Sequence, residues 1–355
     1  MKALILTIGL LTLALQSFLG AQSSTSAPIG FHSELVKAGS FSLIGVNVTN
    51  NVNEPHHRSI QEMFGPNNET GLKEGKPEEA DIIWLPDFDH GYVKIYYNDK
   101  LQTFPPITVG WKGVGFGNAD MSQFEPPSNR GFFIESKKDY DWYITFGGYI
   151  KQTEMFYDVE PGMNVLNKGF PTNIQLNESG IEQSEGFEHG DQNTGDVIWV
   201  YRSDGTYDRY YYTDGGHDRF PPLTPGWKRF GGGDGDVGHH ILSSSFIVET
   251  KGGGGEITLH PPAGFVRTRG VTDPLAPPRA NLLWSILEDT KGIPNFVVWW
   301  DSVSGDIIYT TEAYNGSSWI FISEQRNLPG QILSNYATLG MGWGVARVVA
   351  EWSGF

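Results

Sequence analysis

The sequence contains no cysteine, which limits both its stability and its chemistry. Without cysteine no disulfide framework forms, so packing and hydrogen bonds must stabilise the fold. The same absence excludes thiol catalysis and metal sites built from thiolates. Basic residues are also few: 25 Lys and Arg stand against 41 Asp and Glu, a formal net charge of −16. Because this charge repels phosphates and anionic lipid surfaces, nucleic acid is not an expected partner.

Long apolar runs are absent after the first residues of the chain. Lys2 provides a short positive region, and residues 3–19 are almost wholly apolar before the small pair Gly20 and Ala21. This order is typical of a secretory signal peptide, so we predict cleavage after Ala21. The alternative is a retained membrane anchor, because the segment is close to the roughly 20 residues that span a bilayer. After removal of the signal, no membrane span is expected.

Glycine, proline and aromatic residues are abundant: the chain has 45 Gly, 21 Pro and an aromatic content of 13%. Short aromatic or β-branched runs are bounded by Asp-Gly, Gly-Gly and Pro-Pro pairs, a pattern typical of strands joined by tight turns. We therefore predict an all-β fold. Only residues 280–288 and 332–337 offer weak helical alternatives beyond the N-terminal segment. The length that remains after Ala21 predicts two or three domains.

An internal repeat is the main signal in the sequence. The segment Asp-Ile-Ile-Trp at 81–84 recurs about 115 residues later as Asp-Val-Ile-Trp at 196–199. Farther along the chain, Phe-Pro-Pro-Ile-Thr-Val-Gly-Trp-Lys at 104–112 matches Phe-Pro-Pro-Leu-Thr-Pro-Gly-Trp-Lys at 220–228. We interpret the chain as tandem small β-modules, sandwich-like or barrel-like, with a diverged C-terminal unit.

The repeat sets the predicted domain boundaries. A signal peptide at 1–21 precedes a first β-module at 22–145, a second at 146–258 and the diverged β-unit at 259–355. The segment 50–79 inside the first module is polar and rich in Pro, Gly and Asn. We interpret it as an inserted surface loop.

The Gly-Trp-Lys segment of each copy contains a candidate ligand-binding residue. Trp111 and Trp227 occupy the same place in the two copies, and an exposed tryptophan beside a polar residue can stack on a sugar ring. The competing interpretation is stronger, because a tryptophan at one fixed strand position of each module is more often part of the aromatic core. We therefore expect burial and keep ligand binding as the alternative.

A glycine-rich loop after each Gly-Trp-Lys segment supplies paired oxygen ligands. Asn118 and Asp120 lie in this loop in the first copy, and Asp234 and Asp236 lie in it in the second. Hard Ca²⁺ uses such oxygens, but a full calcium loop needs six or more and normally includes a bidentate Glu. Asx turns, in which the side chains bond nearby backbone N–H groups, explain the same residues without metal. We expect no cofactor, with calcium as the alternative.

Motifs that carry catalysis are missing. The sequence has no Gly-x-Ser-x-Gly segment, no His-Glu-x-x-His segment and no P-loop. Of its nine histidines, four form two adjacent pairs and three lie in polar segments. Adjacent residues on a strand point to opposite faces and do not chelate one metal. We interpret the following as solvated: His56 with His57, His239 with His240, and His90, His189 and His217.

Several short segments together carry a family resemblance. They are Ala-Pro-Ile-Gly-Phe at 27–31, Ala-Gly-Ser at 38–40, the Asp-x-Ile-Trp and Gly-Trp-Lys segments, the Asn/Asp-x-Asp loop and Phe-Ile-Val-Glu at 246–249. Over most of residues 27–260 the chain resembles a family of uncharacterised exported β-repeat proteins of planctomycete and verrucomicrobial bacteria. The resemblance implies an envelope or extracellular location and no known activity. The C-terminal third departs from the pattern.

Repeated aromatic modules without convergent catalytic groups suit binding better than turnover. We therefore predict a non-catalytic protein that is secreted, periplasmic or on the cell surface. Its predicted role is to bind or scaffold an extracellular or envelope glycan or protein. One alternative is a carbohydrate-binding protein, with or without calcium. Another is a secreted polysaccharide hydrolase whose site matches no recognised motif.

Overall fold

The computed structural model divides the chain into two compact units, residues 29–267 and residues 1–28 with 268–355. The described residues are 23–25, 29–49, 58–87, 91–103, 106–127, 129–151, 153–202, 204–216 and 222–262, and six strands between 282 and 352. The predicted signal peptide lies outside them. Within these described residues, no helix has the length and apolarity that crossing a bilayer requires.

The all-β prediction is confirmed. Strands make up most of the regular structure in both units, and every strand pair is antiparallel in the register of the described residues. Among those residues the only α-helix is α2 (Ile60–Phe64), with two short 3₁₀ turns, η1 (Leu176–Glu178) and η2 (Ile181–Gln183). This content agrees with a chain rich in aromatic residues, glycine and proline.

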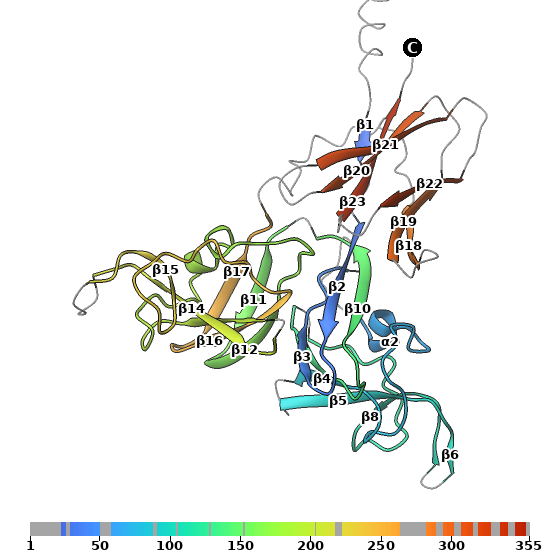
Figure 1. Ribbon diagram of the computed structural model, residues 1–355, viewed down its shortest axis with the longest axis horizontal. Coiled ribbons are helices and arrows are strands. Elements are labelled where there is room, and N and C mark those ends of the chain that lie inside the picture. Colours follow the sequence, from blue (N-terminus) through green and yellow to red (C-terminus); the bar gives the residue numbers. More distant parts are fainter. Residues whose placement is uncertain are drawn as a thin grey trace, which may run out of the picture. The chain divides into compact units, whose positions relative to one another are not determined.

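The first five-stranded sheet is built from residues 41–135 (Figure 1). Across the sheet its strands are β3 (Phe41–Ile44), β9 (Phe132–Glu135), β4 (Ile82–Asp87), β5 (Gly91–Asn98) and β8 (Gly110–Gly113). Two smaller ribbons accompany it: β2 (Ile29–Val36) with β10 (Trp142–Tyr149), and β6 (Gln102–Thr103) with β7 (Pro106–Ile107).

The second five-stranded sheet is built from residues 162–250 and has the same order of strands. Its members are β12 (Gly162–Asn167), β16 (Ser245–Thr250), β13 (Val197–Tyr201), β14 (Tyr207–Thr213) and β15 (Gly226–Arg229). A ribbon of β11 (Met155–Val159) and β17 (Gly255–Leu259) precedes β12 and follows β16 along the chain, as β2 precedes β3 and β10 follows β9. That the two halves are copies of one module stays a prediction.

Each sheet buries one tryptophan of its edge strand against a tyrosine of the neighbouring strand. Tyr97 is opposite Trp111 in the first sheet, and Tyr212 is opposite Trp227 in the second. The ring centroids lie 5.1 Å and 5.4 Å apart, with interplanar angles of 76° and 77°. These edge-to-face pairs add to the stability that burial of the rings provides.

The segment 50–79 differs from the surface loop that the sequence predicts. In its described part, residues 58–79, helix α2 buries Ile60, Met63 and Phe64 in the core. Positions 60, 63 and 64 lie on one helical face, which explains how a polar segment contributes an apolar surface. A capping box starts the helix, with the Ser59 N–H donating to Glu62 Oε2 at 2.8 Å.

The unit that contains the C-terminal residues has a different strand order. One sheet has three strands in the order β18 (Leu282–Glu288), β19 (Pro294–Asp301) and β22 (Ser334–Leu339). In the other set, β1 (Ser23–Thr25) pairs with β23 (Val345–Trp352), which pairs with β20 (Ile307–Tyr314), which pairs with β21 (Trp319–Asn327). The weak helical alternatives at 280–288 and 332–337 are wrong, because pairing with β19 draws both segments into a sheet.

Direct hydrogen bonds join the two five-stranded sheets into one unit. The Asn167 backbone N–H donates to the Asn129 carbonyl at 2.9 Å, and the Asn167 side-chain amide donates to the Val46 carbonyl at 2.5 Å. The Tyr201 hydroxyl donates to the Phe41 carbonyl at 3.1 Å. Because these bonds satisfy backbone groups of both halves, neither half completes its hydrogen bonding alone.

Apolar side chains fill the seam between the sheets. Leu43 of the first sheet packs with Val165 and Ile247 of the second, and all three are buried. Partly buried aromatic residues surround them: Phe133, Trp199, Tyr201 and Tyr207. Part of each sheet is therefore covered by the other half at this seam.

Two glycines allow the halves to approach this closely. A Cβ at Gly45 would lie 2.5 Å from the Ser244 carbonyl oxygen, and a Cβ at Gly131 would lie 1.7 Å from Ser245 Oγ. The first contact is with rigid backbone, so a side chain at position 45 would push the sheets apart.

We predict that Gly45→Ala destabilises both sheets together, by about 1 to 3 kcal/mol, the usual cost of overpacking. Hydrogen exchange should show weaker protection of β4 and of β13 to a similar extent. Gly235→Ala is the matched control, because a Cβ there meets nothing within 4 Å. Loss of protection confined to one sheet would show that the halves are independent.

Candidate functional site

The structure places the two candidate ligand-binding tryptophans in the core. Trp111 and Trp227 are each 1% exposed, so neither indole ring has an open face for a sugar. Each also packs against a phenylalanine, Trp111 on Phe64 at 5.7 Å and Trp227 on Phe187 at 5.6 Å. The two phenylalanines come from different places in the two halves, Phe64 from α2 and Phe187 from the loop before β13.

The two indoles differ in their hydrogen bonding. Trp111 Nε1 donates to the Gly65 carbonyl at 2.9 Å, at the C-terminal end of α2. Trp227 Nε1 is buried and has no partner among the described residues. The inserted helix therefore contributes a polar contact to the first core that the second core lacks.

The lysine after each tryptophan is also buried and ties the edge strand to the following loop. Lys228 is fully buried, and its Nζ donates to Thr224 Oγ1 at 3.0 Å and to the Asp234 carbonyl at 2.8 Å. Lys112 makes the corresponding bonds, to Thr108 Oγ1 at 2.9 Å and to the Asn118 carbonyl at 3.4 Å. These bonds satisfy an ammonium group that burial would otherwise make costly.

The side chains proposed as calcium ligands take part in the same arrangement. Asp234 Oδ1 accepts from the Thr224 N–H at 2.8 Å and lies 3.2 Å from Lys228 Nζ. Asn118 Oδ1 likewise accepts from the Thr108 N–H at 2.7 Å. The hydrogen bond from Thr224 holds the pKa of Asp234 below its ordinary value. An ammonium group this close opposes the binding of a cation at the carboxylate.

The second residue of each pair forms a local turn. Asp120 Oδ1 accepts from the Ser122 N–H at 2.9 Å, and Asp236 Oδ1 accepts from the Gly238 N–H at 3.2 Å. These are the Asx-type contacts that explain the residues without metal. Over the part of the chain that the structure describes, no group of three or more His, Cys, Asp or Glu side chains gathers to hold a metal ion.

Two of the described histidines, His189 and His240, are hydrogen-bonded to neighbouring groups of the protein. His189 Nδ1 lies 2.9 Å from Asp214 Oδ1, and its Nε2 lies 2.5 Å from the Glu182 carbonyl. His240 Nδ1 lies 3.1 Å from the Tyr210 hydroxyl, and the His239 and His240 rings are 4.7 Å apart. His56, His57, His90 and His217 lie outside the described residues.

Sequence reasoning did not identify a groove of about 460 Å³ at one end of the first sheet. Its walls come from three segments: residues 39–41 at the start of β3, the turn that carries Glu78 and Glu79, and residues 135–137 at the end of β9. Lys73 also lines it. Phe41 forms an apolar part of the wall and is 45% exposed.

No family model matches this chain, and no curated protein matches it.

Some carboxylate and ammonium groups of the groove are hydrogen-bonded within the protein, and others are exposed to solvent. Glu135 Oε2 accepts from Trp84 Nε1 at 3.1 Å, and Glu135 Oε1 bonds Lys137 Nζ. Lys73 Nζ donates to the Lys137 carbonyl at 2.9 Å, which leaves it further donors. Glu78 and Glu79 are exposed. The wall therefore presents hydrogen-bond acceptors and a cation next to an aromatic ring.

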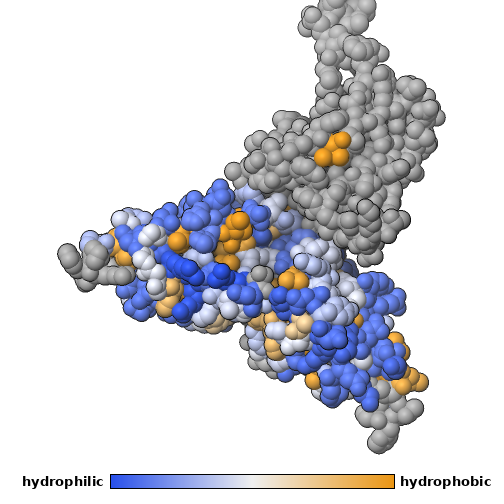
Figure 2. Space-filling view, viewed as in Figure 1, coloured by the Kyte–Doolittle hydropathy of each residue, from blue (hydrophilic) through white to orange (hydrophobic). Residues whose placement is uncertain are grey.

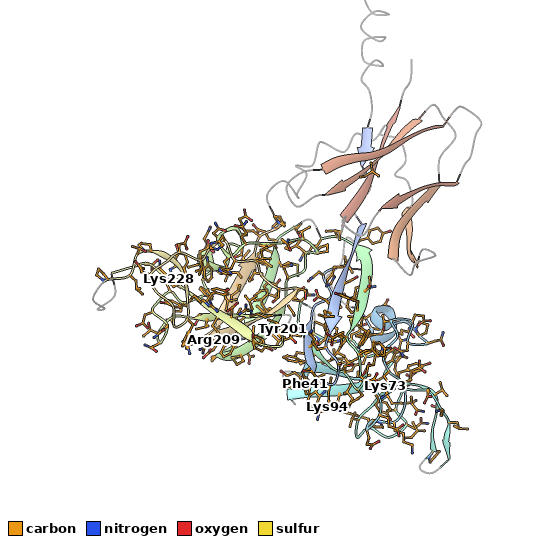
Figure 3. The ribbon with its side chains drawn as sticks, viewed as in Figure 1. Phe41, Lys73, Lys94, Tyr201, Arg209 and Lys228 are labelled. Carbon is orange, nitrogen blue, oxygen red and sulfur yellow. The ribbon has the colours of Figure 1, made fainter. Side chains whose placement is uncertain are left out.

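An indole with a cation over it stands beside the groove and has a counterpart in the second sheet. Lys94 Nζ lies 3.8 Å from the centre of the Trp84 ring, and Arg209 Cζ lies 5.0 Å from the centre of the Trp199 ring. Figure 3 labels Phe41, Lys73 and Lys94 on the first half and Arg209 on the second. These cation–π contacts stabilise, in each sheet, the face that carries the tryptophan.

The framework around the groove is shared by the second sheet. The Lys73 N–H donates to Asp81 Oδ2 at 2.8 Å, and the Glu188 N–H donates to Asp196 Oδ2 at 2.9 Å. Trp199 Nε1 bonds Glu249 Oε2 at 3.0 Å, as Trp84 bonds Glu135.

The residues that face the groove are not shared. Glu188 replaces the cation Lys73, and the turn at 191–195 has Asn193 and Thr194 where the first turn has Glu78 and Glu79. In that turn Asp191 Oδ1 accepts from the Asn193 N–H, the Thr194 N–H and Thr194 Oγ1. The second turn uses its polar groups internally, whereas the first turn lines a recess. This difference between the two matching segments of the sequence is the signal that could have indicated the groove.

We predict that Trp111→Phe costs more stability than Trp227→Phe, by about 0.5 to 1.5 kcal/mol, because only the first loses a hydrogen bond and leaves a carbonyl unpaired. Both Trp→Ala variants should cost about 3 to 5 kcal/mol, the usual cost of emptying a buried aromatic site. Chemical denaturation of the four variants measures these differences. Equal costs for the two Phe variants would contradict the assigned role of the Gly65 carbonyl.

We also predict opposite effects for a reciprocal exchange in the glycine-rich loops. Asp234→Asn should lower the melting temperature, because it removes the ion pair with buried Lys228, and Asn118→Asp should raise it by adding one beside Lys112. The pKa of Asp234 is lowered, so its contribution is present above the ordinary value of 3.8 and is lost as the pH falls through the folded pKa. Wild type and Asp234→Asn should therefore converge in acid. A constant difference at all pH values would refute the ion-pair explanation.

Proposed function

We propose that this protein is a non-catalytic binding protein and that the groove of the first sheet is its ligand site. The observation that supports the proposal is the contrast between the sheets. The internal bonds of Asp81, Trp84 and Glu135 recur in the second sheet, whereas Lys73, Glu78 and Glu79 do not recur as residue types. Residues whose bonds recur in both sheets are explained by the stability of the sheets. The residues that differ between the sheets and line a recess are therefore the ones available to bind a ligand.

A glycan is the ligand class that suits this wall best. Carboxylates of Glu78 and Glu79 accept hydrogen bonds from sugar hydroxyls, and the ammonium of Lys73 donates to sugar oxygens. The exposed part of Phe41 offers an apolar surface to a pyranose ring. On the face drawn in Figure 2, the described surface is mostly hydrophilic with small hydrophobic areas, which also favours a polar ligand.

The two sheets are, in this proposal, tandem copies of one module. The same strand order, the paired tyrosine and tryptophan, and the buried lysine bonds support a duplication. After duplication, both copies would keep the framework and the first would acquire the residues that line the groove. Secretion or surface display remains part of the proposal through the predicted signal peptide at 1–21.

A glycan array with purified protein tests the binding function. We expect Glu78→Gln combined with Glu79→Gln to weaken binding of any retained glycan at least about tenfold, since hydrogen bonds to charged groups contribute about 1.5 to 3 kcal/mol. Glu125→Gln is the matched control, because Glu125 is an exposed carboxylate of the same half that does not line the groove.

Three outcomes would contradict the proposal. Binding that survives the double substitution would place the ligand elsewhere. Absence of any retained glycan, with a retained protein partner, would favour scaffolding. Release of shorter products from a bound polysaccharide would favour the hydrolase alternative.

A further inference from the structure

A second, smaller recess lies at the junction of the two sheets and has different chemistry. It measures about 20 Å³, which is enough for one atom-sized occupant. Much of its wall is apolar and includes Val46, Met63 and Phe132. Its polar wall comes from Arg58 just before α2, from Asn129 and Arg130 before β9, and from Asn167 at the end of β12.

Arg58 brings an incompletely bonded guanidinium to this recess. Its Nη2 donates to the Glu62 carbonyl at 3.2 Å. Its Nε and Nη1 atoms are buried and have no hydrogen-bond partner among the described residues. A guanidinium stays charged near neutral pH, so burial cannot be offset by loss of a proton. A buried charge of this kind requires a counter-charge or polar contacts.

The described wall of the recess contains no acidic side chain to supply that counter-charge. The carboxylate of Glu62 is the nearest by sequence, and it accepts from the Ser59 N–H at 2.8 Å and from Ser59 Oγ at 3.1 Å as part of the helix cap. Arg130 adds a second guanidinium, whose Nη2 donates to the Asp158 carbonyl at 2.5 Å. Glu62 acts electrostatically on Arg58, but the wall of the recess itself carries two guanidinium groups and no carboxylate.

We propose that this recess binds a single monatomic anion, of the size of chloride, on the unpaired N–H groups of Arg58. The inference is independent of the glycan groove. The small volume favours a monatomic anion over sulfate and phosphate, which need space for several oxygens. Asn129 Oδ1 is buried and also unpaired, and as an acceptor it suits a water molecule rather than an anion. Water satisfies hydrogen bonds but carries no charge, so the guanidinium favours the anion.

The position of the recess gives the anion a structural role. Arg58 precedes helix α2, which packs Phe64 on Trp111, and Asn167 belongs to the second sheet. An anion held there would link the inserted segment of the first half to the seam between the halves. Binding to the folded state alone would raise the stability of the unit of residues 29–267 in proportion to anion occupancy.

Thermal unfolding of the full chain in mixtures of sodium chloride and sodium gluconate at constant ionic strength tests the proposal. We expect a saturable rise in melting temperature with chloride, a similar rise with bromide and none with sulfate. Arg58→Met should abolish the chloride dependence and Arg58→Lys should retain part of it. The matched control is Arg202→Met, because the Arg202 side chain is exposed and pairs with Asp208 at 3.4 Å.

Crystals grown in bromide provide a measurement that does not depend on the folding of a variant. An anomalous bromide peak beside Arg58 Nε or Nη1 would support the site. A normal water peak without anomalous signal would show water only and would overturn the proposal. Equal melting temperatures in chloride and gluconate would overturn it as well, as would a chloride dependence that Arg58→Met leaves unchanged.

Discussion

The buried lysine at the edge of each five-stranded sheet is the interaction on which the rest of this cysteine-free unit depends. Lys112 and Lys228 follow the core tryptophans directly, so one residue of the edge strand fills the core and the next bonds the loop beyond it. An ammonium in a low-dielectric interior is costly unless its donors are used. Satisfying it therefore specifies the conformation of the glycine-rich loop, a role that a disulfide often has in an exported domain.

Such a framework separates residues that stabilise the sheets from residues that, in the proposed function, contact a ligand. The aromatic pairs, the buried lysines and the Trp-to-Glu bonds occur in both sheets, and their side chains are bonded within the protein. The residue types of Lys73, Glu78 and Glu79 in the groove do not recur in the second sheet. Because the residues of the groove lie in a turn and at strand ends, they can change without disturbing the sheet behind them. This arrangement is suited to a scaffold that presents one variable surface.

The sequence predicted the strands well and the connections less well. Regular aromatic runs between glycine and proline pairs indicated β4, β5, β13 and β14, since strand formation there follows local pattern. Residues 280–288 and 332–337 were ambiguous because pairing with β19, which is remote in sequence, decides their conformation. Helix α2 was missed because polar neighbours hide its single apolar face.

By itself, the sequence determined the β class, the matching segments and the interpretation of Trp111 and Trp227 as core residues, because these depend on composition and on local order. Only the tertiary structure decided which polar side chains face a recess. Glu78 and Lys73 line the groove because β3, β9 and β4 pair side by side. Arg58 and Asn167 line one recess because hydrogen bonds join the two halves. Such contacts join residues far apart in the chain, and their formation depends on the packing of the whole unit rather than on local pattern.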